Sequence, residues 1–258
     1  MRVYEIPEGS RTTKGRAIQN LINIEQDDRV KAFICTQDLK DEEYINSHYV
    51  IMATKKGQVK KTSLEKYSRP RANGINGITI KDGDELLEAR LTNGNSQILL
   101  AVKSGKAIRF EESKTRPMGR SASGVRGITL ANEQDEVVGM VAVNDMDANI
   151  LVVSENGFGK RSSLDDYRTT NRGGKGVKTI SVTEKTGALV TLKSVTDLDD
   201  LMIINKSGIA IRMAVSDLRV MGRATQGVKL INIKGNDSIA AVAKTMKDDE
   251  EVEDVSDI

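Results

Sequence analysis

The sequence predicts an all-β protein, a propeller-like ring of about five four-stranded units of which the first is incomplete. One layout recurs along the chain: an apolar run, a glycine turn, one or two basic residues, a polar connection and a second glycine. The second glycines, Gly74, Gly124, Gly176 and Gly227, follow one another at steps of 50, 52 and 51 residues. Sustained helical periodicity is absent. Four strands in about 50 residues is the blade pattern of propeller-like rings.

Each unit opens with a predicted hairpin. Its first strand is short and continuously apolar, which indicates burial on both faces. It runs into Lys-Gly, Ser-Gly or Asn-Gly, which supply the positive φ of a tight hairpin. The first strands are predicted at 49–54, 97–102, 149–154 and 201–205, and the return strands at 58–62, 106–110, 158–162 and 209–213. Third strands are predicted at 74–80, 124–130, 176–182 and 227–233, and fourth strands at 85–91, 136–143, 188–195 and 238–243.

The repeats divide one predicted domain, residues 1–247, into units at about 1–48, 49–95, 96–147, 148–198 and 199–247. In the first unit, 11–15, 21–24 and 30–34 match only the second half of the layout, and its opening hairpin is missing apart from a remnant at 2–4. A closed ring is therefore expected to need completion from elsewhere.

The net charge of +2 conceals an asymmetry. Residues 248–258 contain seven acidic residues and no basic one, which leaves 39 basic and 30 acidic residues in 1–247, a balance of +9. A basic body with an acidic, disordered tail indicates a polyanion-binding surface for which the tail competes. The alternative is a tail that only aids solubility.

Composition excludes several classes of function. Cys35 is the only cysteine and His48 the only histidine, so a disulfide framework, a cysteine-rich zinc site and a histidine-rich metal site are excluded. There is no tryptophan for a WD repeat and no P-loop for ATP. No apolar run reaches transmembrane length and no signal peptide is recognisable, so we expect a cytoplasmic protein that has no membrane partner and no cofactor of its own.

Basic residues recur in the connection between the second and third strands. An arginine lies four residues before the second glycine, or three in the shorter second copy, and another base lies farther upstream. Guanidinium groups contact phosphate in a bidentate way, so equivalent positions on one edge of a ring predict a DNA-binding stripe. The alternative is that these are ordinary solvated loop residues. The predicted site comprises Arg11, Arg69, Arg71, Arg116, Arg120, Arg168, Arg172, Lys175, Arg219 and Arg223 of the connections and Lys60, Lys61, Arg109, Lys160, Arg161 and Arg212 of the return strands.

The expected partner is double-stranded DNA. No aromatic residues interleave with the basic residues, which disfavours binding of single-stranded DNA by stacking. Nothing in the pattern indicates contacts with base edges, so we expect weak sequence specificity.

Several segments together resemble the C-terminal domain of the A subunit of DNA gyrase: 2–11, 54–62, 116–120, 124–128, 156–161 and 220–227. The resemblance covers essentially the whole chain. It implies a β-pinwheel, a propeller-like disc whose neighbouring blades exchange strands, and an activity of wrapping DNA with positive handedness. It also implies that the holoenzyme partners, the gyrase A breakage-reunion domain and gyrase B, carry the DNA-cleaving tyrosine and the chemistry of ATP and Mg²⁺. The isolated domain is expected to be a monomer.

One departure from the family concerns its hallmark box, Gln-Arg-Arg-Gly-Gly-(Arg or Lys)-Gly, which belongs to the mostly missing first blade. The nearest match is 171–176, which keeps Gly-Gly-Lys-Gly but lacks the leading Gln-Arg. We therefore expect binding and bending of DNA, while support of supercoiling is in doubt. Two further interpretations stay open: the equivalent domain of topoisomerase IV, and a propeller-type protein-interaction scaffold.

Overall fold

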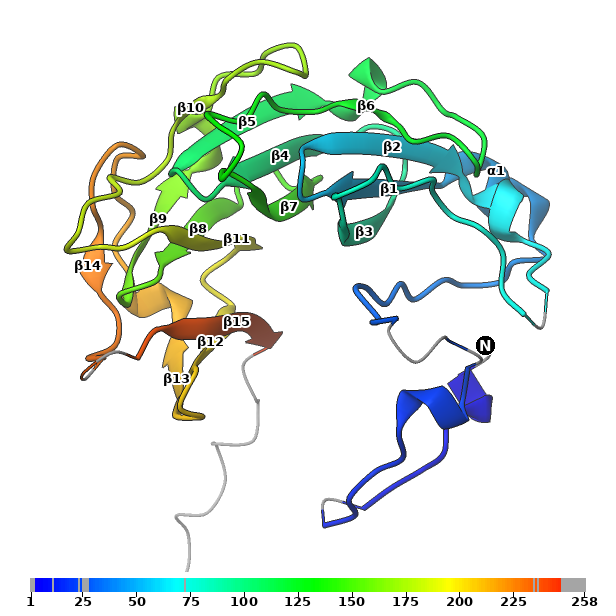
Figure 1. Cartoon of the computed structure of the whole chain (residues 1–258), viewed down its shortest axis with the longest axis horizontal. Helices are drawn as coiled ribbons and strands as arrows, with labels where there is room; N and C mark the ends of the chain where they lie inside the picture. The colour runs from blue at the N-terminus through cyan, green and yellow to red at the C-terminus, as the bar shows by residue number, and fades with distance from the viewer. Residues whose placement is uncertain are drawn as a thin grey trace, which may run out of the picture.

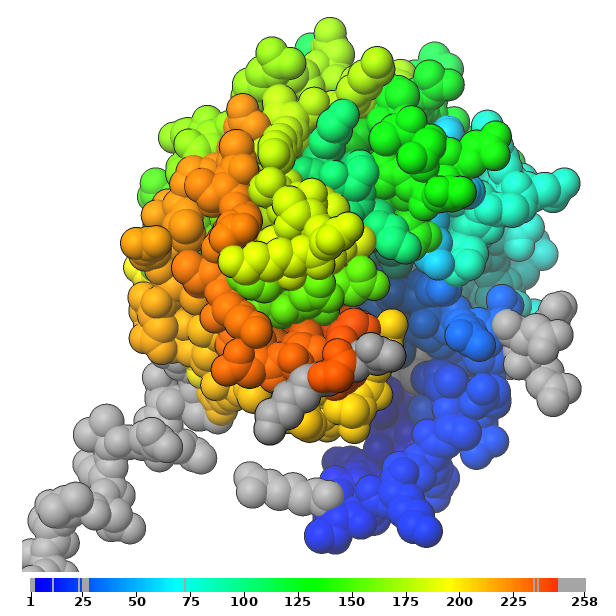
Figure 2. Space-filling model, turned by 60° about the vertical axis from the view of Figure 1, so that its left-hand side comes forward, coloured from blue at the N-terminus to red at the C-terminus, as the bar shows by residue number. Residues whose placement is uncertain are grey.

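The computed structural model describes residues 3–10, 12–22, 24, 28–71, 73–233, 235 and 237–246. It confirms the all-β prediction. Four antiparallel sheets stand side by side and form an open arc (Figure 1). The space-filling view shows that successive repeats, from green through yellow to orange, adjoin one another (Figure 2).

The strands belong to four sheets. The first contains β1 (Tyr49–Thr54), β2 (Gln58–Ser63), β3 (Leu86–Thr92) and β6 (Val125–Arg126). The second contains β4 (Gln97–Val102), β5 (Lys106–Glu111), β7 (Val137–Val143) and β10 (Val177–Lys178). The third contains β8 (Asn149–Ser154), β9 (Phe158–Ser163), β11 (Leu189–Val195) and β14 (Val228–Lys229), and the fourth β12 (Asp199–Asn205), β13 (Ala210–Ala214) and β15 (Ile239–Met246). The described helices are α1 (Glu42–Ser47) and the 3₁₀ turns η1 (Val3–Glu5), η2 (Ile18–Asn20), η3 (Leu64–Tyr67), η4 (Glu112–Lys114), η5 (Leu164–Asp166) and η6 (Val215–Asp217).

Neighbouring repeats exchange strands, as the family resemblance implies. The first sheet has the order β3-β1-β2-β6, and β6 comes from the following repeat. In the same way β10 pairs with β5 and β14 pairs with β9. These short exchange strands lie on the outside of the arc, and β3, β7, β11 and β15 lie on the inside (Figure 1). Each of the last three repeats is therefore locked to the one before it along the outer perimeter.

The second glycine of the repeat is explained by this exchange. Gly124 and Gly176 have φ of +90° and +70°, a region that favours glycine. A Cβ on either residue would lie 2.5 Å from a backbone oxygen of the preceding return strand, that of Val59 or Ala107 respectively. Gly74 also has a positive φ, +74°, but a Cβ there would meet nothing within 4 Å. Gly124 and Gly176 therefore lie against the preceding repeat, whereas Gly74 does not.

The hydrophobic core lies between the sheets. On β4, Ile98 and Leu100 pack against the first sheet, whereas Leu99 and Ala101 pack against the third. Successive side chains of a strand point to opposite faces, so a strand between two sheets must be apolar throughout. The prediction that the first hairpin strands are buried on both faces is thus confirmed.

Some predicted strands differ from the structure. The third strands at 124–130, 176–182 and 227–233 pair over only two residues each, and 74–80 is not a strand. The described part of residues 1–48 contains no strand, so the one implied at 30–34 is also absent. Instead, Ala32 and Ile34 pack against the first sheet, and α1 begins after Asp41, whose carboxylate accepts a hydrogen bond from the Tyr44 N–H. In the later repeats, the segments equivalent to 30–34 and 74–80 pair with a strand of a hairpin. Among the described residues, the first repeat has no hairpin, so neither segment has a strand to pair with.

Candidate nucleic-acid interface

The basic connections cross the outer perimeter in a fixed register. After β5, β9 and β13 the chain forms a 3₁₀ turn and then runs parallel to the preceding return strand before it reaches the exchange strand. The parallel bridges are Lys61 with Pro117, Arg109 with Thr169 and Arg161 with Val220. The N–H groups of Met118, Thr170 and Met221 donate to the backbone oxygens of Lys61, Arg109 and Arg161 at 2.7, 2.9 and 2.9 Å. Equivalent residues of successive connections therefore occupy equivalent places.

The first row of basic residues consists of Arg116, Arg168 and Arg219. Each lies directly before the residue that forms the parallel bridge, and each is exposed. Arg69 and Arg71, in the connection of the second repeat, are exposed as well. These predicted residues are placed where a polyanion can reach them.

The second row consists of Arg120, Arg172 and Arg223, which are half-buried. Arg172 donates from Nε to the Lys114 oxygen at 3.0 Å and from Nη1 to the Arg126 oxygen at 3.1 Å. Arg223 repeats the pattern one repeat later, with the oxygens of Asp166 and Lys178 at 2.9 and 2.8 Å. A guanidinium has five N–H donors, so each of these two arginines joins neighbouring connections and retains donors for phosphate.

A third row was not predicted. Arg126, Lys178 and Lys229 lie on the exchange strands β6, β10 and β14, and all three are exposed. Each follows the second glycine of its repeat by two residues, so the same spacing could have identified them. Asn76 occupies this position in the second repeat.

Five predicted interface residues are buried: Lys60, Lys61, Arg109, Lys160 and Arg161. Lys61 forms an ion pair with the fully buried Glu112 at 2.8 Å. Arg109 donates to the backbone oxygens of Leu164 and Tyr167 at 2.9 and 3.2 Å, and burial lowers its pKa.

Arg161 likewise donates to the Leu218 oxygen and pairs with Asp197. Arg109 and Arg161 hold the 3₁₀ turn of the next repeat against the return strand, so the prediction that the five buried residues contact DNA is corrected. Arg212 is exposed and pairs with Asp200 at 2.8 Å.

The box-like segment 171–176 packs against the preceding connection. The Gly173 N–H donates to the Gly127 oxygen at 2.6 Å, and Thr129 donates through N and Oγ1 to the oxygens of Gly174 and Gly173 at 2.9 and 2.7 Å. Lys175 is exposed beside these contacts. Arg11, the remaining predicted residue, lies outside the described residues.

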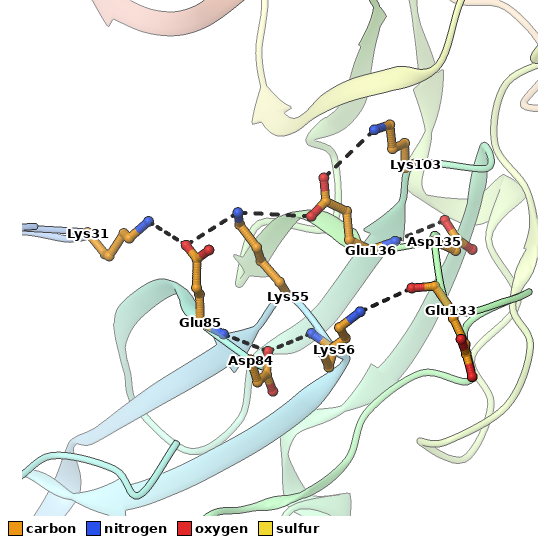
Figure 3. A network of polar contacts seen from close by, with 9 residues as sticks. All are labelled: Lys31, Lys55, Lys56, Asp84, Glu85, Lys103, Glu133, Asp135 and Glu136. Carbon is orange, nitrogen blue, oxygen red and sulfur yellow. Dashed lines mark hydrogen bonds and ion pairs between the residues drawn. The ribbon is translucent and has the colours of Figure 1, made fainter. Parts of the chain in front are cut away.

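Bases on the hairpin-turn edge are paired with acids instead. Lys55 lies between Glu85 and Glu136 at 3.3 and 3.9 Å, and Lys31 and Lys103 extend the chain of alternating charges (Figure 3). The hydrogen bonds from Lys31 and Lys55 lower the pKa of Glu85. This network is locally neutralised, in contrast to the three rows.

Within the described part of the chain, no group of three or more His, Cys, Asp or Glu residues is arranged to hold a metal ion. No helix there is long and apolar enough to cross a membrane.

Comparison with known proteins identifies the family. The family model of the DNA gyrase C-terminal domain, a β-propeller, matches residues 1–37, 48–93, 97–144, 148–196 and 199–246. The A subunit of DNA gyrase from Staphylococcus aureus (strain MRSA252) is 44% identical over 257 residues, which are 98% of this chain and 28% of that protein. The corresponding protein of Staphylococcus epidermidis (strain ATCC 12228 / FDA PCI 1200) is 43% identical over 251 residues, 97% of this chain and 28% of that protein. The chain thus spans just over a quarter of the length of these relatives.

Two solved structures share the fold. The C-terminal domain of a DNA topoisomerase IV aligns with a TM-score of 0.84 at 25% identity, covering 95% of this chain and 74% of that one. A DNA gyrase A C-terminal domain aligns with a TM-score of 0.78 at 24% identity, covering 91% of this chain and 76% of that one. The repeat pattern, the exchanged strands and the match of the family model across all five repeats agree: the chain belongs to the family of DNA gyrase A C-terminal domains.

Proposed function

We propose that this chain binds double-stranded DNA along its outer perimeter and bends the duplex around it. The observation that carries the proposal is the recurrence of three basic positions in three successive repeats, two in the connection and one on the exchange strand. The positions are Arg116, Arg120 and Arg126 in one repeat, Arg168, Arg172 and Lys178 in the next, and Arg219, Arg223 and Lys229 in the last.

Repetition of charge in register suits a polymer of phosphates. A single exposed arginine in a loop is usually solvated, but these connections are tied to the preceding strand by the same backbone bonds in each repeat. The cations therefore recur along a curved surface, where the backbone of a bent duplex can contact several sheets in succession (Figure 1). Smooth bending of a 20–30 bp duplex through 40–90° costs roughly 1–6 kcal/mol, which many phosphate contacts can offset.

The same surface disfavours other nucleic acids and sequence-specific binding. The connections that carry the three rows contain one aromatic residue, Tyr167, and it is buried, so unpaired bases have no exposed ring there on which to stack. Cations that lie on a perimeter and contact phosphates carry no sequence information by themselves. We therefore assign weak sequence preference and a duplex substrate.

Within a gyrase A protein, this domain would wrap DNA with positive handedness, so that an ATP-driven holoenzyme introduces negative supercoils. Its partners would be the breakage-reunion domain of gyrase A and the gyrase B protein in the bacterial cytoplasm. Strand cleavage and the use of ATP and Mg²⁺ would belong to those parts, and this domain would contribute the path of the DNA.

The salt dependence of binding tests the role of the perimeter. If about eight phosphates are neutralised, the logarithm of the association constant will fall against the logarithm of salt concentration with a slope near −7. Fluorescence anisotropy with a labelled duplex between low and physiological salt measures this slope. A slope near zero would show that these rows are not the binding surface.

A topoisomerase IV C-terminal domain is the second candidate, because such a domain gives the higher of the two TM-scores. Ligation of nicked circular DNA in the presence of the chain separates the two, since bound writhe is trapped as a change in linking number. We expect positive writhe to accumulate as the amount of protein rises. Tight binding without trapped writhe would favour the topoisomerase IV type, and absence of DNA binding would favour a protein-interaction scaffold.

A further inference from the structure

A buried lysine lies beneath two of the arginine-bearing connections. Lys60 on β2 and Lys160 on β9 are equivalent in the repeat and only 0% and 1% exposed. The same position holds Ile108 on β5 and Ile211 on β13. Two repeats thus place an apolar side chain where the other two place a charge, so the fold itself does not require lysine at this position.

Both ammonium groups bind the backbone of the next connection, and that of Lys60 also binds the backbone of its own repeat at Gly77. Lys60 Nζ donates to the oxygens of Gly77 and Arg120, both at 2.5 Å. Lys160 Nζ donates to the oxygen of Gly222, the residue directly before Arg223, at 2.5 Å. Both lysines therefore reach outward from a return strand and hold the backbone at a second-row arginine from the inside.

The surroundings of Lys60 disfavour its charge. Burial lowers the pKa of Lys60 to about 8, and the nearby Arg120 lowers it as well. The other titratable group at this site is Tyr67, whose hydroxyl donates to the same Gly77 oxygen at 3.2 Å.

The site of Lys160 has the same character. Burial lowers the pKa of Lys160 to about 8, Asp166 raises it and Arg223 lowers it. Tyr167 is also buried there, hydrogen-bonded to Thr179, and burial raises the pKa of its hydroxyl to about 12. A buried charge of this kind usually costs stability compared with an apolar residue of similar size.

We propose that Lys60 and Lys160 are positioning residues for DNA binding: each fixes the second-row arginine of the next connection from the inside and places a positive charge behind the phosphate path without contacting phosphate. This inference rests on the proposed function, because it assigns the lysines a role at the same perimeter. It explains why a charge is buried at a position that accepts isoleucine elsewhere.

The test replaces both lysines with the residue that the other repeats carry, in the double variant K60I/K160I. We expect the affinity for duplex DNA at pH 7 to fall at least about ten-fold, because the second-row arginines lose the contacts that fix their backbone and two positive charges behind the phosphate path are removed. The melting temperature should stay the same or rise. The slope of log affinity against log salt should not change, because no phosphate contact is removed.

A matched control removes two charges elsewhere. K55Q/K103Q alters two lysines of the hairpin-turn network that are paired with glutamates and should bind DNA as the unaltered chain does. A slope that becomes shallower by about two in K60I/K160I would instead show direct phosphate contact by the two lysines. Unchanged affinity in that variant would show that the lysines serve the fold alone.

A second measurement uses the unaltered chain and so does not depend on whether a variant folds. Calorimetric titration of the unaltered chain with duplex at about pH 8, in two buffers of different ionisation enthalpy, reports protons exchanged on binding. Phosphates near a half-protonated lysine favour its charged form, so binding should take up protons. Zero uptake would overturn the inference, whereas a chain that does not bind DNA at all would overturn the proposed function instead.

Discussion

Replacing Arg116, Arg168 and Arg219 together with glutamine will lower the affinity for duplex DNA about a thousand-fold and leave the fold intact. The three side chains are exposed and occupy the same place in successive connections. If each loses a hydrogen bond to a charged group worth about 1.5 kcal/mol, the sum corresponds to roughly three powers of ten. The salt slope should also become shallower by about 2.7, because each phosphate that is no longer neutralised accounts for about 0.9. Anisotropy titrations at several salt concentrations measure both quantities.

The first row is the better target because its side chains are not part of the scaffold. Arg172 and Arg223 donate to backbone oxygens of the neighbouring connection, so their removal would disturb the perimeter as well as its charge. The matched control is K55Q/R90Q/K103Q, which removes three charges paired with glutamates away from the rows. If the first-row variant retains its affinity, or if the control loses as much, DNA binding does not follow the connections.

The pairing of strands is the part of the fold that the sequence could not supply. Apolar runs and glycine turns place both strands of each hairpin within a residue or two of their observed bounds. Spacing also locates the third strands along the chain, but it cannot tell whether such a segment pairs with its own hairpin or with the preceding one. That depends on a long-range contact, such as that of Val125 with Val59. For the same reason 74–80, which shares the pattern, is not a strand within the described residues.

For a related reason, the sequence predicted the exposed arginines of the connections but not the burial of the basic residues on the return strands. A loop rich in arginine indicates surface charge, and the structure exposes Arg116, Arg168 and Arg219 accordingly. Basic residues on the return strands suggest the same interpretation, although β2, β5 and β9 each lie between two other strands of their sheet. Lys61 shows the consequence, because its charge is buried against Glu112. The exposed exchange-strand bases were missed because they lie beyond the second glycine, outside the connection in which the arginines recur.

Changing Gly176 to alanine will destabilise the domain far more than the same change at Gly74. Both residues have a positive φ, so alanine costs about 1–2 kcal/mol at either position for the backbone alone. At Gly176 the added Cβ would also meet the backbone oxygen of Ala107 at 2.5 Å, and relief of such a clash typically costs a further ~1–3 kcal/mol. At Gly74 nothing lies within 4 Å. Urea unfolding of the two variants, followed by circular dichroism, compares the free energies of unfolding.

The Gly176 variant should also bind DNA less tightly, because the connection that ends there carries Arg168 and Arg172 and continues into Lys178. Displacing β10 from β5 would shift one member of each row relative to its neighbours, and a duplex that contacts all three connections at once would lose that register. Gly74→Ala provides the comparison, since it introduces the same backbone strain without a clash. Equal destabilisation by the two changes would mean that Gly176 is needed only for its positive φ and not for the contact between repeats. A larger effect at Gly176, in both stability and affinity, would mean that strand exchange between repeats is what aligns the DNA-binding surface.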